Sequence, residues 1–217
     1  RRAGSLDAKR HRAAREPLFR AYALTALASL REAACQTQLE SLLEKATDDE
    51  TRYGAFRALL ILTPRNPAVM GKEVPGGFML HKVASEGESM VHLSTSRRAE
   101  VVLFGPAPRL KGAFSLLAGE FTVTAIAGDE RCTVSRTPSN GRVERKSCPM
   151  EVEDVVLCLA SMGAQYPDVL EIMRQAGAAE ALSCRMRLDA LPRAVRLEEL
   201  LASGADETLL PAGQDLG

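Results

Sequence analysis

Short apolar runs separated by glycine, proline, serine or asparagine fill the middle of the chain. In the segment EFTVTAIAG, Phe121 and Val123 alternate with Thr122 and Thr124, the two-residue period of a strand with one buried face. Turn signals recur about every ten residues, a spacing typical of antiparallel sandwiches. The pattern predicts an antiparallel β-sandwich or small barrel over residues 73–148. The expected strands are 78–84, 90–96, 100–105, 113–119, 120–128, 131–137 and 141–147.

Helical periodicity returns after Pro149. An apolar stripe from Val152 to Ala160 ends at Gly163, and a second short helix begins near Pro167 and ends near Gly177. The segment 182–192 alternates again and is expected to return as a strand. We therefore expect a helical segment with a possible return strand over 149–192, followed by a tail over 193–217.

Two stretches before Pro64 repeat each other at a distance of 32 residues, counted from Arg20 to Arg52. Each has the pattern R-x-x-A-x-x-A-L, once in LFRAYALTAL and once in ETRYGAFRAL. Between them, QTQLESLLEKA has its leucines at helical spacing, and Thr47 with Glu50 matches a capping box. A fixed period of this size is typical of a solenoid, and an ordinary alanine-rich helical hairpin is the alternative.

The repeated unit resembles a HEAT repeat of the short bacterial type, which implies a helical repeat segment over residues 1–66. The positions 32 residues before Leu39, Leu42 and Leu43 are Asp7, Arg10 and His11, which cannot form an apolar helix face. We therefore expect the segment to be the end of a longer array. The expected fold class is α+β, in the order HEAT-like helical repeats, small antiparallel β-sandwich or barrel, and short helical C-terminal segment.

The overall charge excludes some classes of partner. The chain has 28 Lys and Arg residues against 28 Asp and Glu residues, so no general positive field attracts nucleic acid or an anionic membrane. The basic start, RRAGSLDAKRHRAAR, is typical of a solvated linker. No apolar run is long enough to span a bilayer.

A second resemblance covers about residues 16–196. The strings ETRYGAFRAL, FMLHKV, VHLSTSRRAEVVLFG, GAQYPDVLEIMRQA and LDALPRAVR resemble the C-terminal extension of some bacterial proteins related to the flagellar P-ring protein. In that family HEAT-like repeats and a β region follow a ring-forming domain. The resemblance implies a structural, periplasmic component and implies no catalysis.

Residues with candidate chemistry are few. The sequence has no glycine-rich phosphate loop and no H-E-x-x-H, G-x-S-x-G or C-x-x-C motif. A two-residue turn at Glu86-Gly87 would pair His81 with His92 across a hairpin, as a weak metal site or an incidental polar pair. Hydroxyl and guanidinium groups in the next turn suggest an anion site, with a plain polar turn as the alternative. These residues are Ser94, Ser96, Arg97 and Arg98.

Two of the five cysteines are predicted to face each other. A three-residue loop over 139–141, with Gly141 in the left-handed position, pairs Cys132 with Cys148. A two-residue Asn-Gly turn would instead move Cys148 to the other face. The adjacency permits a disulfide in an oxidising compartment, whereas the odd number of cysteines favours reduced thiols.

These observations predict a non-enzymatic structural or protein-interaction module that contacts its partner through the helical repeats. The alternatives are a P-ring-like periplasmic structural protein and an enzyme with an unrecognised site. No cofactor or catalytic residue is expected.

Overall fold

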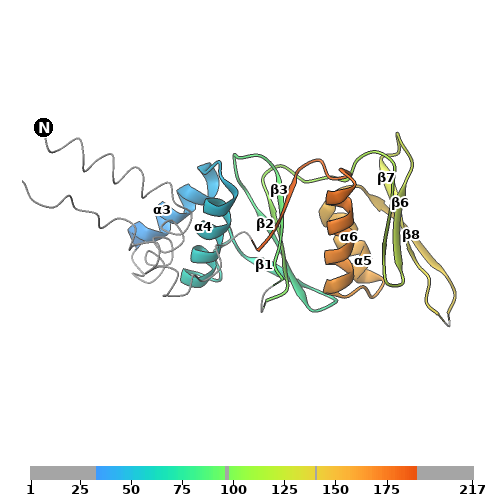
Figure 1. Cartoon of the computed structure of the whole chain (residues 1–217). Helices are drawn as coiled ribbons and strands as arrows, with labels where there is room; N and C mark the ends of the chain where they lie inside the picture. The colour runs from blue at the N-terminus through green and yellow to red at the C-terminus, as the bar shows by residue number, and fades with distance from the viewer. Residues whose placement is uncertain (1–32, 96–97, 140, 190–217) are drawn as a thin grey trace, which may run out of the picture.

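The computed structural model describes residues 33–95, 98–139 and 141–189 of the 217-residue chain. Its elements stack in four layers: a helical hairpin, a sheet, a pair of helices and a second sheet (Figure 1). Two apolar cores fill this stack, one between the hairpin and the first sheet and a larger one that includes both sheets and the central helices.

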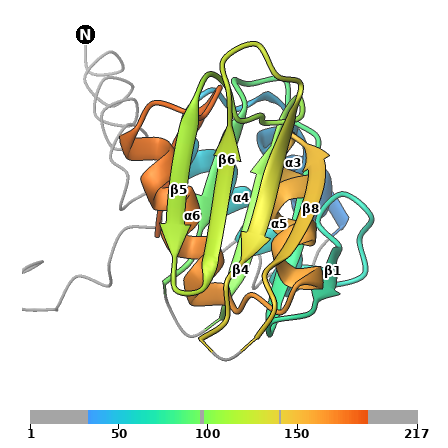
Figure 2. The same ribbon diagram turned by 90° about the vertical axis from the view of Figure 1, so that its right-hand side faces the viewer.

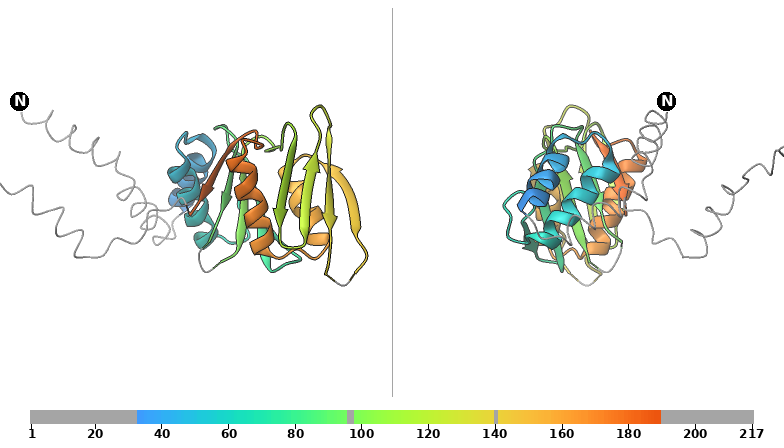
Figure 3. Two further views of the ribbon diagram at one scale, coloured as in Figure 1. Left: turned by 45° about the vertical axis from the view of Figure 1, so that its right-hand side comes forward. Right: turned by 90° about the vertical axis from the view of Figure 1, so that its left-hand side faces the viewer.

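The first layer consists of α3 (Ala33–Lys45) and α4 (Asp49–Leu62), which cover one face of the first sheet (Figure 3). Leu39 and Leu43 of α3 and Phe56 and Leu59 of α4 are buried against sheet residues such as Phe104. The cap of α4 is Asp48, which accepts from the Thr51 N–H at 2.8 Å, so the predicted Thr47–Glu50 capping box is wrong.

The expected HEAT-like repeats are also wrong. The apolar face of this hairpin packs on a β-sheet, whereas in a solenoid the next helical repeat would cover it. The first copy of the motif, beginning at Arg20, lies outside the described residues.

The first sheet contains five strands in the order β1-β2-β4-β3-β9, with both parallel and antiparallel pairs. β4 lies between β2 and β3, parallel to β2 and antiparallel to β3, and β9 adds to β3 in parallel. The expected all-antiparallel sandwich is therefore wrong, because the strand that follows β3 inserts between its two predecessors. The strands are β1 (Gly71–Val74), β2 (Phe78–Val83), β3 (Met90–Leu93), β4 (Glu100–Phe104) and β9 (Arg185–Leu188).

The second sheet is an antiparallel meander in the order β5-β6-β7-β8 (Figure 2). The predicted alternation of β6 is confirmed: Phe121 and Val123 are buried, whereas Thr122 and Thr124 are only partly buried. The strands are β5 (Phe114–Ala118), β6 (Phe121–Ala125), β7 (Arg131–Arg136) and β8 (Glu144–Pro149).

Two helices separate the sheets, α5 (Val152–Ser161) and α6 (Tyr166–Ala178). Gly163 ends α5 with a φ of 94°, and a capping box between Gln165 and Asp168 starts α6. The predicted helices are present, but they are the central layer of the fold instead of an appended segment. Both sheets bury an apolar face against them, so neither sheet can close on the other as a sandwich.

The predicted return strand is confirmed as β9, which follows α6 and reaches the first sheet. Within the described ranges, no helix combines the length and the apolar character needed to cross a bilayer.

Candidate functional site

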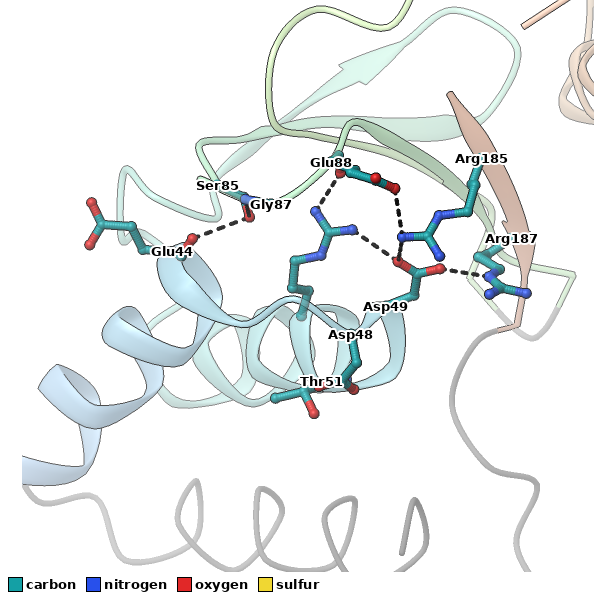
Figure 4. Close-up of polar contacts among 10 residues, drawn as sticks. Glu44, Asp48, Asp49, Thr51, Ser85, Gly87, Glu88, Arg185 and Arg187 are labelled. Carbon is teal, nitrogen blue, oxygen red and sulfur yellow. Dashed lines mark hydrogen bonds and ion pairs between the residues drawn. The ribbon is translucent and has the colours of Figure 1, made fainter. Parts of the chain in front are cut away.

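A buried carboxylate at the start of α4 gathers three guanidinium groups (Figure 4). The Asp49 side chain is 1% exposed and accepts from Arg52 Nη2 at 2.9 Å and from Arg187 Nε at 2.8 Å. Arg185 Nη2 lies 3.5 Å from the same carboxylate. Burial opposes ionisation of Asp49, but the hydrogen bonds from Arg187 and Arg52 outweigh it and hold its pKa below the usual value. The cluster therefore fastens α4 to β9.

Arg52, the motif arginine of the second copy, is fully buried in this cluster. Its Nη1 donates to the carbonyl of Glu88 at 2.7 Å, and its guanidinium carbon lies 5.7 Å from the centroid of the Phe104 ring. The Glu88 carboxylate also lies 3.1 Å from Arg185 Nη2. Arg52 thus holds the loop between β2 and β3 against α4. In a repeat array, the corresponding arginine would instead contact a neighbouring repeat.

One turn further along α4, a second buried carboxylate is held by helix side chains. The Tyr53 hydroxyl donates to Glu100 Oε1 at 2.6 Å, and Arg57 Nη1 lies 3.2 Å from Oε2. Burial, followed by the neighbouring Glu100 charge, raises the pKa of Tyr53 above its usual value. Both oxygens of this carboxylate have partners within the chain, which makes the group a structural anchor.

The two candidate histidines do not form the predicted hairpin pair. Each lies opposite Val102 of β4, His81 on one side and His92 on the other, so two strand spacings, about 10 Å, separate them. The two residues are therefore not direct strand partners, as the predicted hairpin required. Among the described residues, no group of three or more His, Cys, Asp or Glu side chains is arranged to hold a metal.

Both histidines are buried beneath α4. His81 Nδ1 lies 2.8 Å from the Val69 carbonyl, and the His92 ring stacks on Tyr53 with centroids 3.5 Å apart. Burial lowers the pKa of His81, and it lowers the pKa of His92 to about 3. Neutral imidazoles are therefore part of this core.

Half of the predicted anion site, Ser96 and Arg97, lies outside the described residues. Ser94 and Thr95 direct their hydroxyls to the carboxylate of Asp189, which also accepts from the Thr95 N–H at 2.9 Å. Burial opposes ionisation of Asp189, but these hydrogen bonds keep its pKa below the usual value. The hydroxyls thus hold a carboxylate of this chain, and an external anion site including the exposed Arg98 stays a prediction.

The outer side of β9 is an open strand edge among the described residues, because β9 is the last strand of its sheet. The Asp189 N–H donates to Leu93 of β3 at 3.1 Å. Peptide groups alternate in direction along a strand, so those of Met186 and Leu188 are directed to the outer edge.

Two cavities lie near β9, one of about 640 Å³ between the loop before β3 and the residues before β9, and one of about 450 Å³. The second is lined by the consecutive residues 184–187, which belong to both faces of the strand, so it runs along the edge of β9. It also contains Lys111 from before β5 and Glu180 from after α6. Lys111, Arg185 and Arg187 line this cavity beside one carboxylate, that of Glu180, while Asp49 and Glu88 pair with the two arginines from outside its lining.

Cys132 and Cys148 are opposite one another on β7 and β8, which confirms the predicted register. The ladder ends at Arg136 and Glu144, so the loop is longer than the predicted three residues. Asn140 at its tip lies outside the described residues.

The residues of the β9 site were not identified from the sequence. The predicted helix start relied on Thr47 and Glu50 and passed over Asp49, and the alternation over 182–192 indicated only a strand. The available signal was that Arg185 and Arg187 lie on the same face of a strand. If such a face is buried, its arginines need acidic partners.

No protein-family model, curated protein or solved structure matches the chain in comparisons of sequence and fold.

Proposed function

We propose that this chain is a non-enzymatic protein-interaction module that binds an extended acidic segment of a partner protein along β9. The observation that carries the proposal is the open edge of β9, with a cavity along it that three cationic side chains line. A segment added in this way gains backbone hydrogen bonds from the strand edge and specificity from flanking side-chain sites.

The backbone of Met186 and Leu188 supplies two N–H donors and two carbonyl acceptors to such a segment. At a net value of about 0.5–1.5 kcal/mol for each hydrogen bond, this contribution is modest, so flanking contacts must add to it. Arg185 and Arg187 have side chains 48% and 45% exposed despite their bonds to Asp49. Their remaining donors, together with Lys111, favour carboxylates on the partner.

The internal pairing of buried groups supports a non-enzymatic role. The two buried carboxylates, Glu100 and Asp49, each bind side chains of this chain, and these contacts join α4 to β4 and to β9. Catalytic groups are instead expected at an accessible cleft with unsatisfied geometry toward a substrate.

Selection from a displayed library of short linear peptides on the full chain tests the proposal. We expect enrichment of extended sequences with acidic residues, and binding that weakens with added salt. Met186→Pro removes an outward N–H without removing a described ladder bond, so it should abolish binding. Met186→Leu, the matched control, keeps the backbone and should bind normally. No enrichment, or equal binding by the two variants after both are shown to fold by circular dichroism, would contradict the proposal.

The resemblance to P-ring-like proteins supports a second candidate, a structural component of a periplasmic assembly. This candidate rests on the strings between about residues 16 and 196 and stays a prediction. Fractionation of the native host with an antibody to this chain tests it: recovery only in the cytoplasm would contradict a periplasmic role.

A further inference from the structure

Three of the five cysteines meet in the core between the second sheet and α5. Cys132 on β7, Cys148 on β8 and Cys158 on α5 are 1%, 6% and 9% exposed. The Cys148 thiol interacts with both of the others. Cys35 lies on α3 and Cys184 lies beside β9, so neither belongs to this group.

The pair on the sheet has the geometry that a disulfide needs. Cys132 and Cys148 are direct partners in an antiparallel ladder, and their sulfur atoms are 3.4 Å apart. Directly opposed residues in such a ladder have Cα atoms about 4.5–5.5 Å apart, within the range of about 4.4–6.8 Å found across disulfides. Bond formation at about 2.05 Å therefore needs a small side-chain movement and no change of register.

We propose that Cys132 and Cys148 form a disulfide site that closes across β7 and β8 when the chain meets a disulfide oxidant. The thiolate of one cysteine attacks the oxidant, a small or protein disulfide, and releases one thiol. The second cysteine then attacks the mixed disulfide and releases the second thiol. The two cysteines lose two electrons and two protons, and the oxidant is reduced to two thiols.

The position of β8 gives an oxidant access to these buried sulfurs. β8 is the last strand of its sheet, and its residues from Glu144 to Ser147 are exposed. Edge strands open more readily than central ones, so local separation of β8 exposes Cys148 before the rest of the core. An oxidant can also reach the two thiols during folding, before they are buried.

Cys158 is placed to remain a thiol. It reaches Cys148 from a helix, whereas Cys132 is the direct ladder partner. The hydrogen bond from Cys148 lowers the pKa of Cys132, whereas burial raises the pKa of Cys158 to about 11, so Cys132 is the more available thiolate for the first attack. Cys158 therefore serves as an internal control for the specificity of the pair.

The test uses the full chain, unfolded and refolded in a buffer of oxidised and reduced glutathione. Free thiols are alkylated, and the protein is digested without reduction and analysed by mass spectrometry. We expect one crosslink between Cys132 and Cys148 and three alkylated cysteines out of five. The crosslink should persist in Cys158→Ser and disappear in Cys132→Ser. Oxidised wild-type protein should also melt several degrees above the reduced protein, a difference absent from Cys132→Ser.

Two results would overturn the proposal. The first is alkylation of all five cysteines after refolding, and the second is a dominant crosslink between Cys148 and Cys158. The mass spectrum of the wild-type chain decides between these outcomes even if a serine variant folds poorly. A disulfide persists only in an oxidising compartment, so a crosslink in protein from the native host would also support the periplasmic candidate.

Discussion

Acidification should destabilise this protein through His92 before its carboxylates are protonated. The His92 side chain lies beneath α4, its residue is 0% exposed, and its ring stacks on Tyr53. Burial disfavours the imidazolium most, the Asp189 charge partly offsets this, and Arg57 adds to the penalty. The result is a pKa of about 3 in the folded protein, against a usual value of about 6.5.

The direction in which the free energy of unfolding changes with pH follows from proton binding. Below about pH 6.5 the unfolded chain takes up a proton at His92 that the folded protein does not bind. Unfolding is therefore favoured as the pH falls, by about 1.4 kcal/mol per pH unit, and the loss reaches roughly 2 kcal/mol at about pH 5. His81, whose pKa burial also lowers, adds a loss of the same sign. Asp49 and Asp189 have lowered pKa values, so their stabilisation is lost only at lower pH, below about 4.

Urea unfolding at several values between about pH 7 and pH 5 measures this effect. His92→Phe is the matched variant, since it keeps a ring against Tyr53 and cannot titrate. We expect the free energy of unfolding of the wild type to fall across this range and that of the variant to fall less steeply. A flat wild-type profile, or the same slope in both proteins, would refute the reasoning.

Three further changes test the packing of the helical hairpin, each by the shift in urea midpoint. Ala55→Leu should cost about 1–3 kcal/mol by overpacking, because Ala55 is 0% exposed, whereas Ile61→Ala at a 65% exposed position should change little; equal midpoints would contradict the assigned packing. Tyr53→Phe should cost roughly 1–3 kcal/mol because it removes the 2.6 Å hydrogen bond to buried Glu100, and an unchanged midpoint would show that water replaces the hydroxyl. Arg52→Met should cost about 3 kcal/mol or more by leaving Asp49 with only the half-exposed Arg185 and Arg187, while Arg174→Met in the exposed pair with Glu171 should leave the midpoint unchanged. Similar losses in these two arginine variants would argue against a special role for the buried cluster.

Sequence patterns were most accurate where the deciding contacts are close along the chain. The hairpin of β7 and β8 has the predicted register although its loop is longer than the three residues from which that register was predicted, and a slip of one residue would turn Cys148 outward. The helices α5 and α6 follow from apolar spacing with Gly163 and Pro167 at their ends. The leucine pattern of α3 likewise predicted a helix, although it could not show what covers that helix.

Local sequence patterns gave the wrong pairing for His81 and His92. A short loop between β2 and β3 favours a hairpin, but β4 occupies the place between them. Buried strands accept neighbours on both edges, and the sequence of each strand does not specify which neighbour it takes. The R-x-x-A-x-x-A-L motif was ambiguous for a related reason, since small residues on a helix suit a sheet as well as another helix.

The sequence by itself determined most of the local elements, the buried face of β6, and the lack of any long apolar span. Those properties depend on residue period, turn residues and overall hydrophobicity, which are local quantities. Only the tertiary structure decided that the central helices separate two sheets, that β9 joins β3, and that Asp49 meets Arg185 and Arg187. The contacts of β9 join residues 95 to 138 positions apart, and many arrangements bury the same apolar faces. The arrangement that also pairs the buried Asp49 with these arginines is visible only once the layers are assembled.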